Sequence, residues 1–361
     1  MDEVLKKSEL MVLLNQLKKQ GLDEFEILEP YFKNRLLKVN IKDGSYEIEL
    51  SGKEAFDIPI SRDEYWDKKE IPSFKEYKEV LVSAGFVEYE NWEEFKEWIL
   101  HLYKSETDPG LSSEAVFLSI DTNMAYYRFI SRWFPIDYDD FLIEAKDFDY
   151  LLSSIVESEI DHHIKEKYDD SDLKMMGLHT KIGDIRYEFR NRGKLETRKS
   201  KFATEELSYL RSVLNAARIR TSGSKTDSER NDILIVESLE DFCWDKNIDV
   251  ALISTDRNMG NHAENAEIAY FVLELPHSIP KSKKVNSDIL LNLLHDLALM
   301  YGMIELPDIS TKLLGIWGGK RDDHYRSESI KAWINPGSPI ESEVKREKKI
   351  MDSLKRLPSH P

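Results

Sequence analysis

The sequence predicts an α/β protein built around a parallel sheet, and two observations support this. Two apolar, β-type runs each end abruptly on an acid: Phe117–Ile120 is followed by Asp121, and Ala251–Thr255 by Asp256. From residue 111 to about 282, strand-like and helix-like stretches alternate, which is the pattern of a parallel sheet. Ligands bind at the carboxyl ends of such strands, so both acids are predicted to lie at a functional edge.

Residues 1–110 are predicted to form an α+β N-terminal accessory domain. Leucines between positions 5 and 17 suit an amphipathic helix. Alternating runs at 37–41 and 46–50 flank Asp43-Gly44 and predict a β-hairpin. Two further amphipathic helices are expected near 73–83 and 91–104, and Asp108-Pro109-Gly110 marks the expected boundary.

Residues 111–304 are predicted to form the central domain, and 305–361 a C-terminal extension. In the central domain we expect strands at 115–120, 149–154, 250–254 and 268–274, and helices at 123–132, 156–167, 203–219, 232–245 and 285–303. In the extension we expect strands at 312–317 and 329–333 and a charged surface helix or tail at 341–357.

The composition is that of a globular protein, with 41% hydrophobic and 33% charged residues in 361. The single cysteine, Cys243, excludes a disulfide framework and a thiolate zinc cluster. The first residues lack the features of a signal peptide, and polar residues interrupt the longest apolar stretch, Ile289–Met303. We therefore expect a cytoplasmic protein without a membrane partner.

The net charge of −17 argues against a nucleic-acid partner, but its distribution does not. Between Lys181 and Arg230 there are 13 lysines and arginines against 7 acids, a local charge of +6. Cations interleaved with aromatic side chains suit single-stranded RNA. The candidate RNA-binding residues are Arg186, Arg190, Arg192, Lys194, Arg198, Lys199 and Lys201. The alternative, a solvated helical face whose aromatics are core residues, stays open.

Two further acids complete a candidate metal site. Glu159 lies on the apolar-flanked run Ser154–Ile160, and Asp232 opens the apolar run Ile233–Val236. Crowded carboxylates repel one another, and Mg²⁺ or Mn²⁺, which prefer hard oxygen ligands, removes that cost. Such sites hydrolyse phosphodiesters, so the four acids indicate a metal-dependent nuclease.

In order and context, the strings Ile120–Asn123, Val156–Asp161, Asn231–Ile235 and Ile253–Asn258 resemble the PIN-domain nuclease family. The resemblance covers roughly 111–282. It implies a parallel α/β/α sandwich and a Mg²⁺- or Mn²⁺-dependent endoribonuclease acting on single-stranded RNA. It assigns metal binding and catalysis to Asp121, Glu159, Asp232 and Asp256, with Asn123 and Ser254 supporting them by hydrogen bonds. The long segment between Glu159 and Asp232 is then a candidate substrate clamp.

Several alternatives stay open. Asp121 and Asp256 suit helix N-caps, and Asp232 suits a helix dipole, without catalysis. Glu157 rivals Glu159, and Arg257 is placed to neutralise Asp256. At the level of function, the rivals are a catalytically silent PIN-fold scaffold for RNA or protein and, less favoured because Asn123 replaces a second acid, a haloacid-dehalogenase-like phosphatase. A homodimer and a protein partner for the N-terminal domain are also open.

Overall fold

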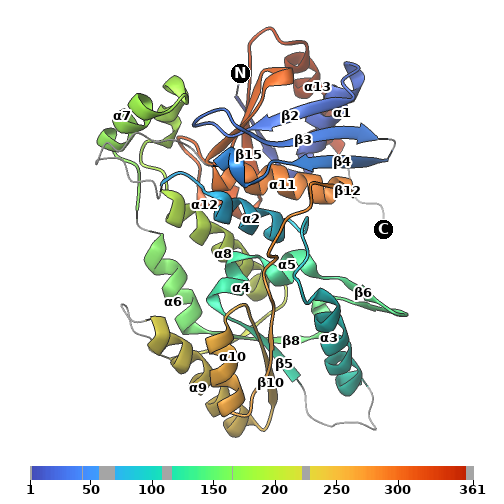
Figure 1. The fold of residues 1–361 in the computed structure, drawn as a ribbon, viewed down its shortest axis with the longest axis vertical. Helices are drawn as coiled ribbons and strands as arrows, with labels where there is room; N and C mark the ends of the chain where they lie inside the picture. The colour runs from blue at the N-terminus through green and yellow to red at the C-terminus, as the bar shows by residue number, and fades with distance from the viewer. Residues whose placement is uncertain are drawn as a thin grey trace. The chain divides into compact units, whose positions relative to one another are not determined.

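The computed structural model describes residues 2–42, 44–56, 70–107, 116–164, 166–221 and 228–354 (Figure 1). The chain forms two compact units. Unit 1 comprises Met1–Phe86, Lys167–Arg198 and Ile279–Pro361; unit 2 comprises Val87–Glu166 and Lys199–Ser278. Within the described ranges, none of the helices has the length and apolar character needed to cross a membrane.

Unit 2 contains a five-stranded parallel sheet in the order β11-β10-β5-β8-β9. Its strands are β5 (Val116–Ile120), β8 (Asp149–Ser153), β9 (Ala217–Ile219), β10 (Asp249–Ser254) and β11 (Ala269–Val272). The chain first adds β8 and β9 on one side of β5, then returns to place β10 on the other side. The strand order therefore reverses between β5 and β10, and ligands of open α/β sheets bind at such a point.

The helices of unit 2 follow the strands in the alternation that the sequence predicts. They are α4 (Thr122–Tyr126) and α5 (Phe129–Trp133) after β5, α6 (Ser154–His163) after β8, α9 (Ser228–Lys246) before β10, and α10 (Arg257–Asn265) after it. Helices α9 and α10 pack against each other, and α6 packs against α4 and α9 (Figure 1). Helix α3 (Trp92–Thr107) also belongs to this unit.

Unit 1 is built on an eight-stranded antiparallel sheet in the order β1-β15-β14-β13-β2-β3-β4-β12. The strands are β1 (Asp2–Lys6), β2 (Glu24–Leu28), β3 (Arg35–Lys42), β4 (Ser45–Leu50), β12 (Ser282–Val285), β13 (Met303–Leu306), β14 (Thr311–Leu314) and β15 (Ser329–Ile334). Because β1 pairs with β15, the two ends of the chain share one sheet. The flanks that the sequence suggests are separate regions thus contribute to the same unit.

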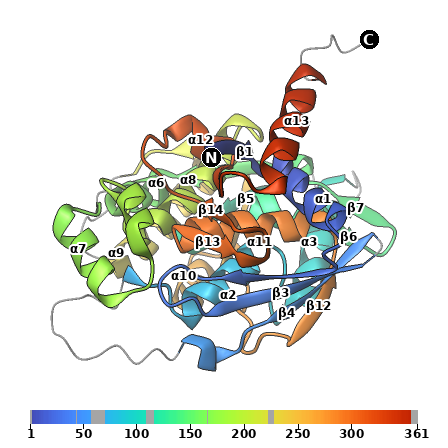
Figure 2. The same ribbon diagram turned by 90° about the horizontal axis from the view of Figure 1, so that it is seen from above.

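One buried helix forms much of the core of unit 1. Helix α11 (Ser287–Met300) contacts β13, β14, β15, β4 and α2 (Phe74–Ser83) (Figure 2). Its leucines are almost fully buried. Helix α1 (Met11–Lys19) packs on α13 (Pro339–Leu354). Unit 1 also receives α7 (Asp170–His179) and the 3₁₀ helix η5 (Gly183–Phe189), which contact each other.

The predicted fold class, mixed α/β with a parallel sheet, is confirmed at this level. Most elements are also confirmed within a few residues, including the β3–β4 hairpin, whose Asp43 lies outside the described residues. Three predictions are wrong. The helix indicated by the leucines from Leu5 to Leu17 begins only at Met11, because Leu5 lies in β1 and Leu10 in a 3₁₀ turn. The helix predicted at 123–132 is divided into α4 and α5, because Arg128 has a left-handed backbone conformation, and the helix predicted at 203–219 ends at Ser212, before β9. Asp108-Pro109-Gly110 lies outside the described residues.

Candidate metal centre at the ends of β5 and β10

Asp121 lies directly after β5 and is 2% exposed. One carboxylate oxygen, Oδ1, accepts a hydrogen bond from the Met124 N–H at 2.8 Å and so caps α4. The other, Oδ2, accepts from the Ser254 hydroxyl at 2.5 Å. Asp121 is therefore a helix cap, but its second oxygen is directed at the neighbouring strand, which capping alone does not require.

Ser254 joins the two strand ends. It is the last residue of β10 and 1% exposed, and its Oγ also accepts a hydrogen bond from the Asp256 N–H at 2.8 Å. Asp256 then caps α10, because its Oδ1 accepts from the Asn258 N–H at 2.8 Å. A single hydroxyl thus connects Asp121 to the turn that carries Asp256. Asn123, by contrast, is exposed.

Glu159 and its rival Glu157 have different environments on α6. Glu157 is buried and forms ion pairs with Arg211, at 3.0 Å, and with Arg218. Glu159 instead accepts hydrogen bonds from the Thr122 hydroxyl and, at 2.7 Å, from the Asn231 amide. Because Thr122 follows Asp121 directly, Glu159 is the acid of this pair that lies on the side of the two strand ends.

The position of Asp232 differs from the sequence expectation. Helix α9 begins at Ser228, four residues earlier, so Asp232 lies in the second turn and does not open the helix. It is half-buried, whereas Asn231 is 4% exposed and contacts Glu159. Asn231 shares a helical face with the buried Ile235, Ser238 and Leu239. The spacing of these residues is a sequence signal that favours Asn231 over Asp232 on the buried face.

The pKa of Asp121 is raised from its ordinary value near 3.8 to about 6. Burial is the largest cause, and the charges of Asp256 and Glu159 raise the pKa further, against the lowering effect of the Ser254 and Met124 hydrogen bonds. The charges of Glu159 and Asp256 are therefore close enough to affect Asp121. Arg257, the alternative neutralising group, forms its ion pair with Glu274 at 2.8 Å.

The donor chemistry of this site suits a hard divalent cation. The three acids supply oxygen ligands, and their hydrogen-bond partners named above are neutral hydroxyl, amide and backbone N–H groups. The side chains are not arranged around one point as the ligands of a bound ion would be. Across the described parts of the chain, no three histidine, cysteine, aspartate or glutamate side chains are placed so as to hold one ion. The residues thus fit a Mg²⁺ or Mn²⁺ ion in type, with Glu159 turned toward Thr122 and Asn231.

The basic run does not form one exposed track. Arg198 is 1% exposed and donates to the Tyr168 hydroxyl at 3.1 Å, so it is a core residue of unit 1. Arg192 donates to the Lys320 carbonyl at 3.0 Å. Arg186, Arg190 and Lys194 form ion pairs with Asp184, Asp170 and Asp172, and Lys199 and Lys201 are half-buried on α8 (Leu195–Ser212). Arg186 and Arg190 accompany an exposed aromatic ring, that of Tyr187.

Comparisons with known proteins add no family. No family model matches the sequence, and a search of curated proteins finds no significant match.

Proposed function

We propose that unit 2 is a metal-dependent endoribonuclease with a PIN-like sandwich, which hydrolyses phosphodiester bonds of single-stranded RNA with Mg²⁺ or Mn²⁺. One observation carries the proposal. Buried Asp121 is bonded through Ser254 to the turn of Asp256, where the strand order reverses, and Glu159 lies beside Thr122. Three acids held by neutral donors at a ligand-binding edge favour a cation supplied from outside the chain.

In this proposal the side chains have separate tasks. Asp121, Glu159 and Asp256 hold the ion, while Ser254 fixes the separation of the two strand ends. Thr122 and Asn231 orient Glu159, as partners of metal-binding groups commonly do. When bound, the divalent ion supplies Lewis acidity toward the phosphate and lowers the pKa of a coordinated water. Asp232 stays a fourth candidate ligand.

A second function, a catalytically silent scaffold, is favoured by a specific observation. Every named oxygen of Asp121 and Glu159 is already bonded to a neutral donor, and the described residues contain no assembled ion-binding group. In that case the hydrogen bonds are structural and no ion enters. The proposed cytoplasmic location, the homodimer and a protein partner for residues 1–110 are common to both functions.

The decisive variant for the proposed function is Asp121→Asn, which keeps the size and capping oxygen of the side chain. Its matched control is Glu157→Gln, which changes a buried acid on α6 that pairs with arginines. We expect Asp121→Asn to abolish Mn²⁺-dependent cleavage of a single-stranded oligoribonucleotide and Glu157→Gln to retain it. Equal cleavage by the wild type and Asp121→Asn would refute the site, and absence of cleavage together with absence of Mn²⁺ binding would favour the scaffold.

A further inference from the structure

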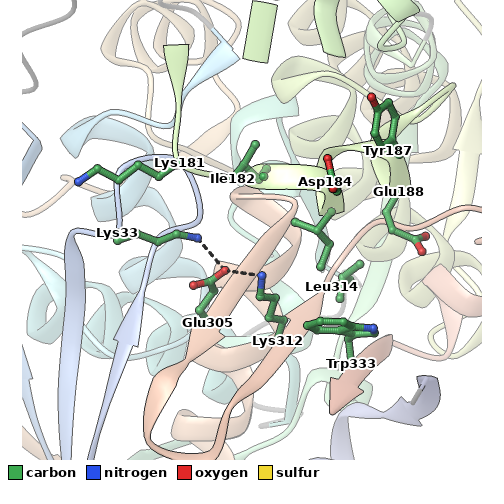
Figure 3. A pocket seen from close by; sticks show the side chains of 12 residues that line it. Lys33, Lys181, Ile182, Asp184, Tyr187, Glu188, Glu305, Lys312, Leu314 and Trp333 are labelled. Carbon is green, nitrogen blue, oxygen red and sulfur yellow. Dashed lines mark hydrogen bonds and ion pairs between the residues drawn. The ribbon is translucent and has the colours of Figure 1, made fainter. Parts of the chain in front are cut away.

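Unit 1 contains a hollow of about 740 Å³ that the proposed active site does not use (Figure 3). On one side it is lined by residues of the segment 181–188, including Ile182 and Tyr187. On the other it is lined by the sheet, through Glu305 of β13, Lys312 and Leu314 of β14, and Trp333 of β15. Lys33 also lines it, so three segments far apart in the sequence build one concave site with lysines and aromatic rings.

The sheet register fixes the floor of this hollow. Glu305 pairs with Lys312 across β13 and β14, and Lys312 pairs with Trp333 across β14 and β15. These cross-strand neighbours form a row on one face, as Figure 3 shows. The ammonium group of Lys312 lies 5.3 Å from the centre of the Trp333 ring. A cation and a flat ring are therefore held side by side by backbone pairing rather than by a loop.

The charges of the floor leave room for an anion. Lys33 donates a hydrogen bond to Oε1 of Glu305 at 2.7 Å, and Lys312 forms an ion pair with the same oxygen at 3.0 Å. Two positive charges thus compensate one negative charge, and each ammonium has two further N–H donors. Lys181, which is exposed, adds a third lysine to the lining, but Asp184 and Glu188 line the same hollow, so its formal charges balance. These two acids form ion pairs with Arg186 and Lys331. The excess of positive charge comes from the neighbouring hollow described next, whose lining has Lys174, Arg186 and Arg190 against Asp170, and a phosphate group matches that excess.

A second hollow of about 440 Å³ adjoins the first, because Tyr187 lines both. Tyr187 is 52% exposed, with the guanidinium of Arg186 at 4.5 Å and that of Arg190 at 5.7 Å from its ring centre. The ion pair between Arg190 and Asp170 is exposed, so solvent screens it and a phosphate can replace the carboxylate at little cost. An exposed ring beside two arginines suits base stacking.

We propose that the two hollows, joined at Tyr187, form a binding track for single-stranded RNA, with bases stacked on Tyr187 and Trp333 and phosphates near Lys33, Lys312, Arg186 and Arg190. The choice of RNA as the nucleic acid rests on the proposed function of unit 2. The track extends the sequence expectation for Arg186 and Arg190 by residues from the first and last parts of the chain. Arg198, one of the cations that the sequence suggests, is buried and is not part of the track.

The test is equilibrium binding of a fluorescein-labelled single-stranded oligoribonucleotide to the full chain in excess EDTA, measured by anisotropy. Tyr187→Leu removes the exposed ring, and loss of one stacked base is expected to weaken binding about tenfold. Lys312→Gln is expected to reduce the slope of log K against log salt by about 0.7, since one phosphate contact is lost. The matched control is Trp244→Leu, which removes an exposed ring (80%) from α9 of unit 2 and should bind like the wild type.

Failure of this inference is distinguishable from failure of the proposed function. If Tyr187→Leu and Lys312→Gln bind RNA like Trp244→Leu while Asp121→Asn abolishes cleavage, the track is refuted and the nuclease stands. If both variants bind weakly but the wild type never cleaves RNA, the track stands and the nuclease is refuted.

Discussion

The ends of β5 and β10 in unit 2 and the floor of the large hollow in unit 1 both contain acids, but the acids have different partners. Asp121 and Glu159 are held by neutral hydroxyl, amide and backbone N–H groups. Glu305 is held by the ammonium groups of Lys33 and Lys312. The partners of a carboxylate, rather than its residue type, therefore indicate what it can bind. Under the two proposals above, the first region would bind a cation, whereas the second has lysines of its own and would bind an anion.

The largest expected effect is on RNA cleavage, when one acid in each region is replaced by its amide. Asp256→Asn should reduce Mn²⁺-dependent RNA cleavage by at least about 100-fold, because loss of a direct ligand costs no less than loss of its hydrogen-bonded neighbours. Glu305→Gln should leave the cleavage rate at saturating RNA unchanged. Single-turnover cleavage assays on both variants check this, and similar losses in the two would break the comparison.

The next effect concerns the stability of the metal-free protein and its pH dependence. The folded-state pKa of Asp121 is about 6, above its ordinary value near 3.8. The folded protein therefore binds this proton more tightly than the unfolded chain does. The resulting contribution to the free energy of unfolding is fully present below about pH 4 and is lost as the pH rises through 6. A shift of this size corresponds to about 3 kcal/mol in the free energy of unfolding.

Asp121→Asn should remove that loss, because the amide does not ionise. Urea denaturation in EDTA at pH values from 4 to 8 should show the variant gaining stability relative to the wild type as the pH rises. Parallel curves for the two proteins would mean that Asp121 has an ordinary pKa, and the electrostatic description of the site would then be wrong.

A smaller effect distinguishes two neighbours on α9. Asn231→Ala should lower cleavage about tenfold, since it removes the amide that orients Glu159. Asp232→Asn should have the smaller effect if the helical face of Asn231 is the one that serves the site. Cleavage rates of both variants at a fixed Mn²⁺ concentration show which substitution costs more activity. A larger loss in Asp232→Asn would favour Asp232 as a metal ligand.

The smallest effect lies in the hollow of unit 1. Glu305→Gln leaves Lys33 and Lys312 without their shared carboxylate, so both lysines become available to phosphate. RNA binding in EDTA should tighten about twofold to fivefold, the range expected for one partly exposed ion pair. Weaker binding of this variant would show that the glutamate itself contacts the ligand or maintains the hollow.

The sequence predicted the parallel sheet well because its strands carry their signal locally. Buried runs such as Val250–Ile253 are apolar throughout and are followed by polar residues, so neither their type nor their end depends on distant partners. The edge strand β9 was missed because it is short and largely exposed and has no apolar pattern. The pairing of β1 with β15 could not be predicted either. The two strands lie near opposite ends of the chain, so no short turn between them marks them as partners.

The candidate site was predictable only in part, for similar reasons. Strand-end acids follow from local pattern, which is how Asp121 and Asp256 were found. The contact of Asn231 with Glu159 depends on where α9 begins, and helix starts are poorly fixed by sequence. The prediction that Arg198 is an exposed RNA-binding residue rested on its charge. The sequence does not distinguish an exposed arginine from a buried one that is hydrogen-bonded to Tyr168.

The most direct test of the central claim is a calorimetric titration of the metal-free wild type and of Asp121→Asn with Mn²⁺ at pH 8, where Asp121 is ionised. We predict saturable binding to the wild type that is lost in Asp121→Asn and weakened in the wild type below pH 6. Equal Mn²⁺ binding by the two proteins, or none by either, would contradict the assignment of a metal centre to the ends of β5 and β10.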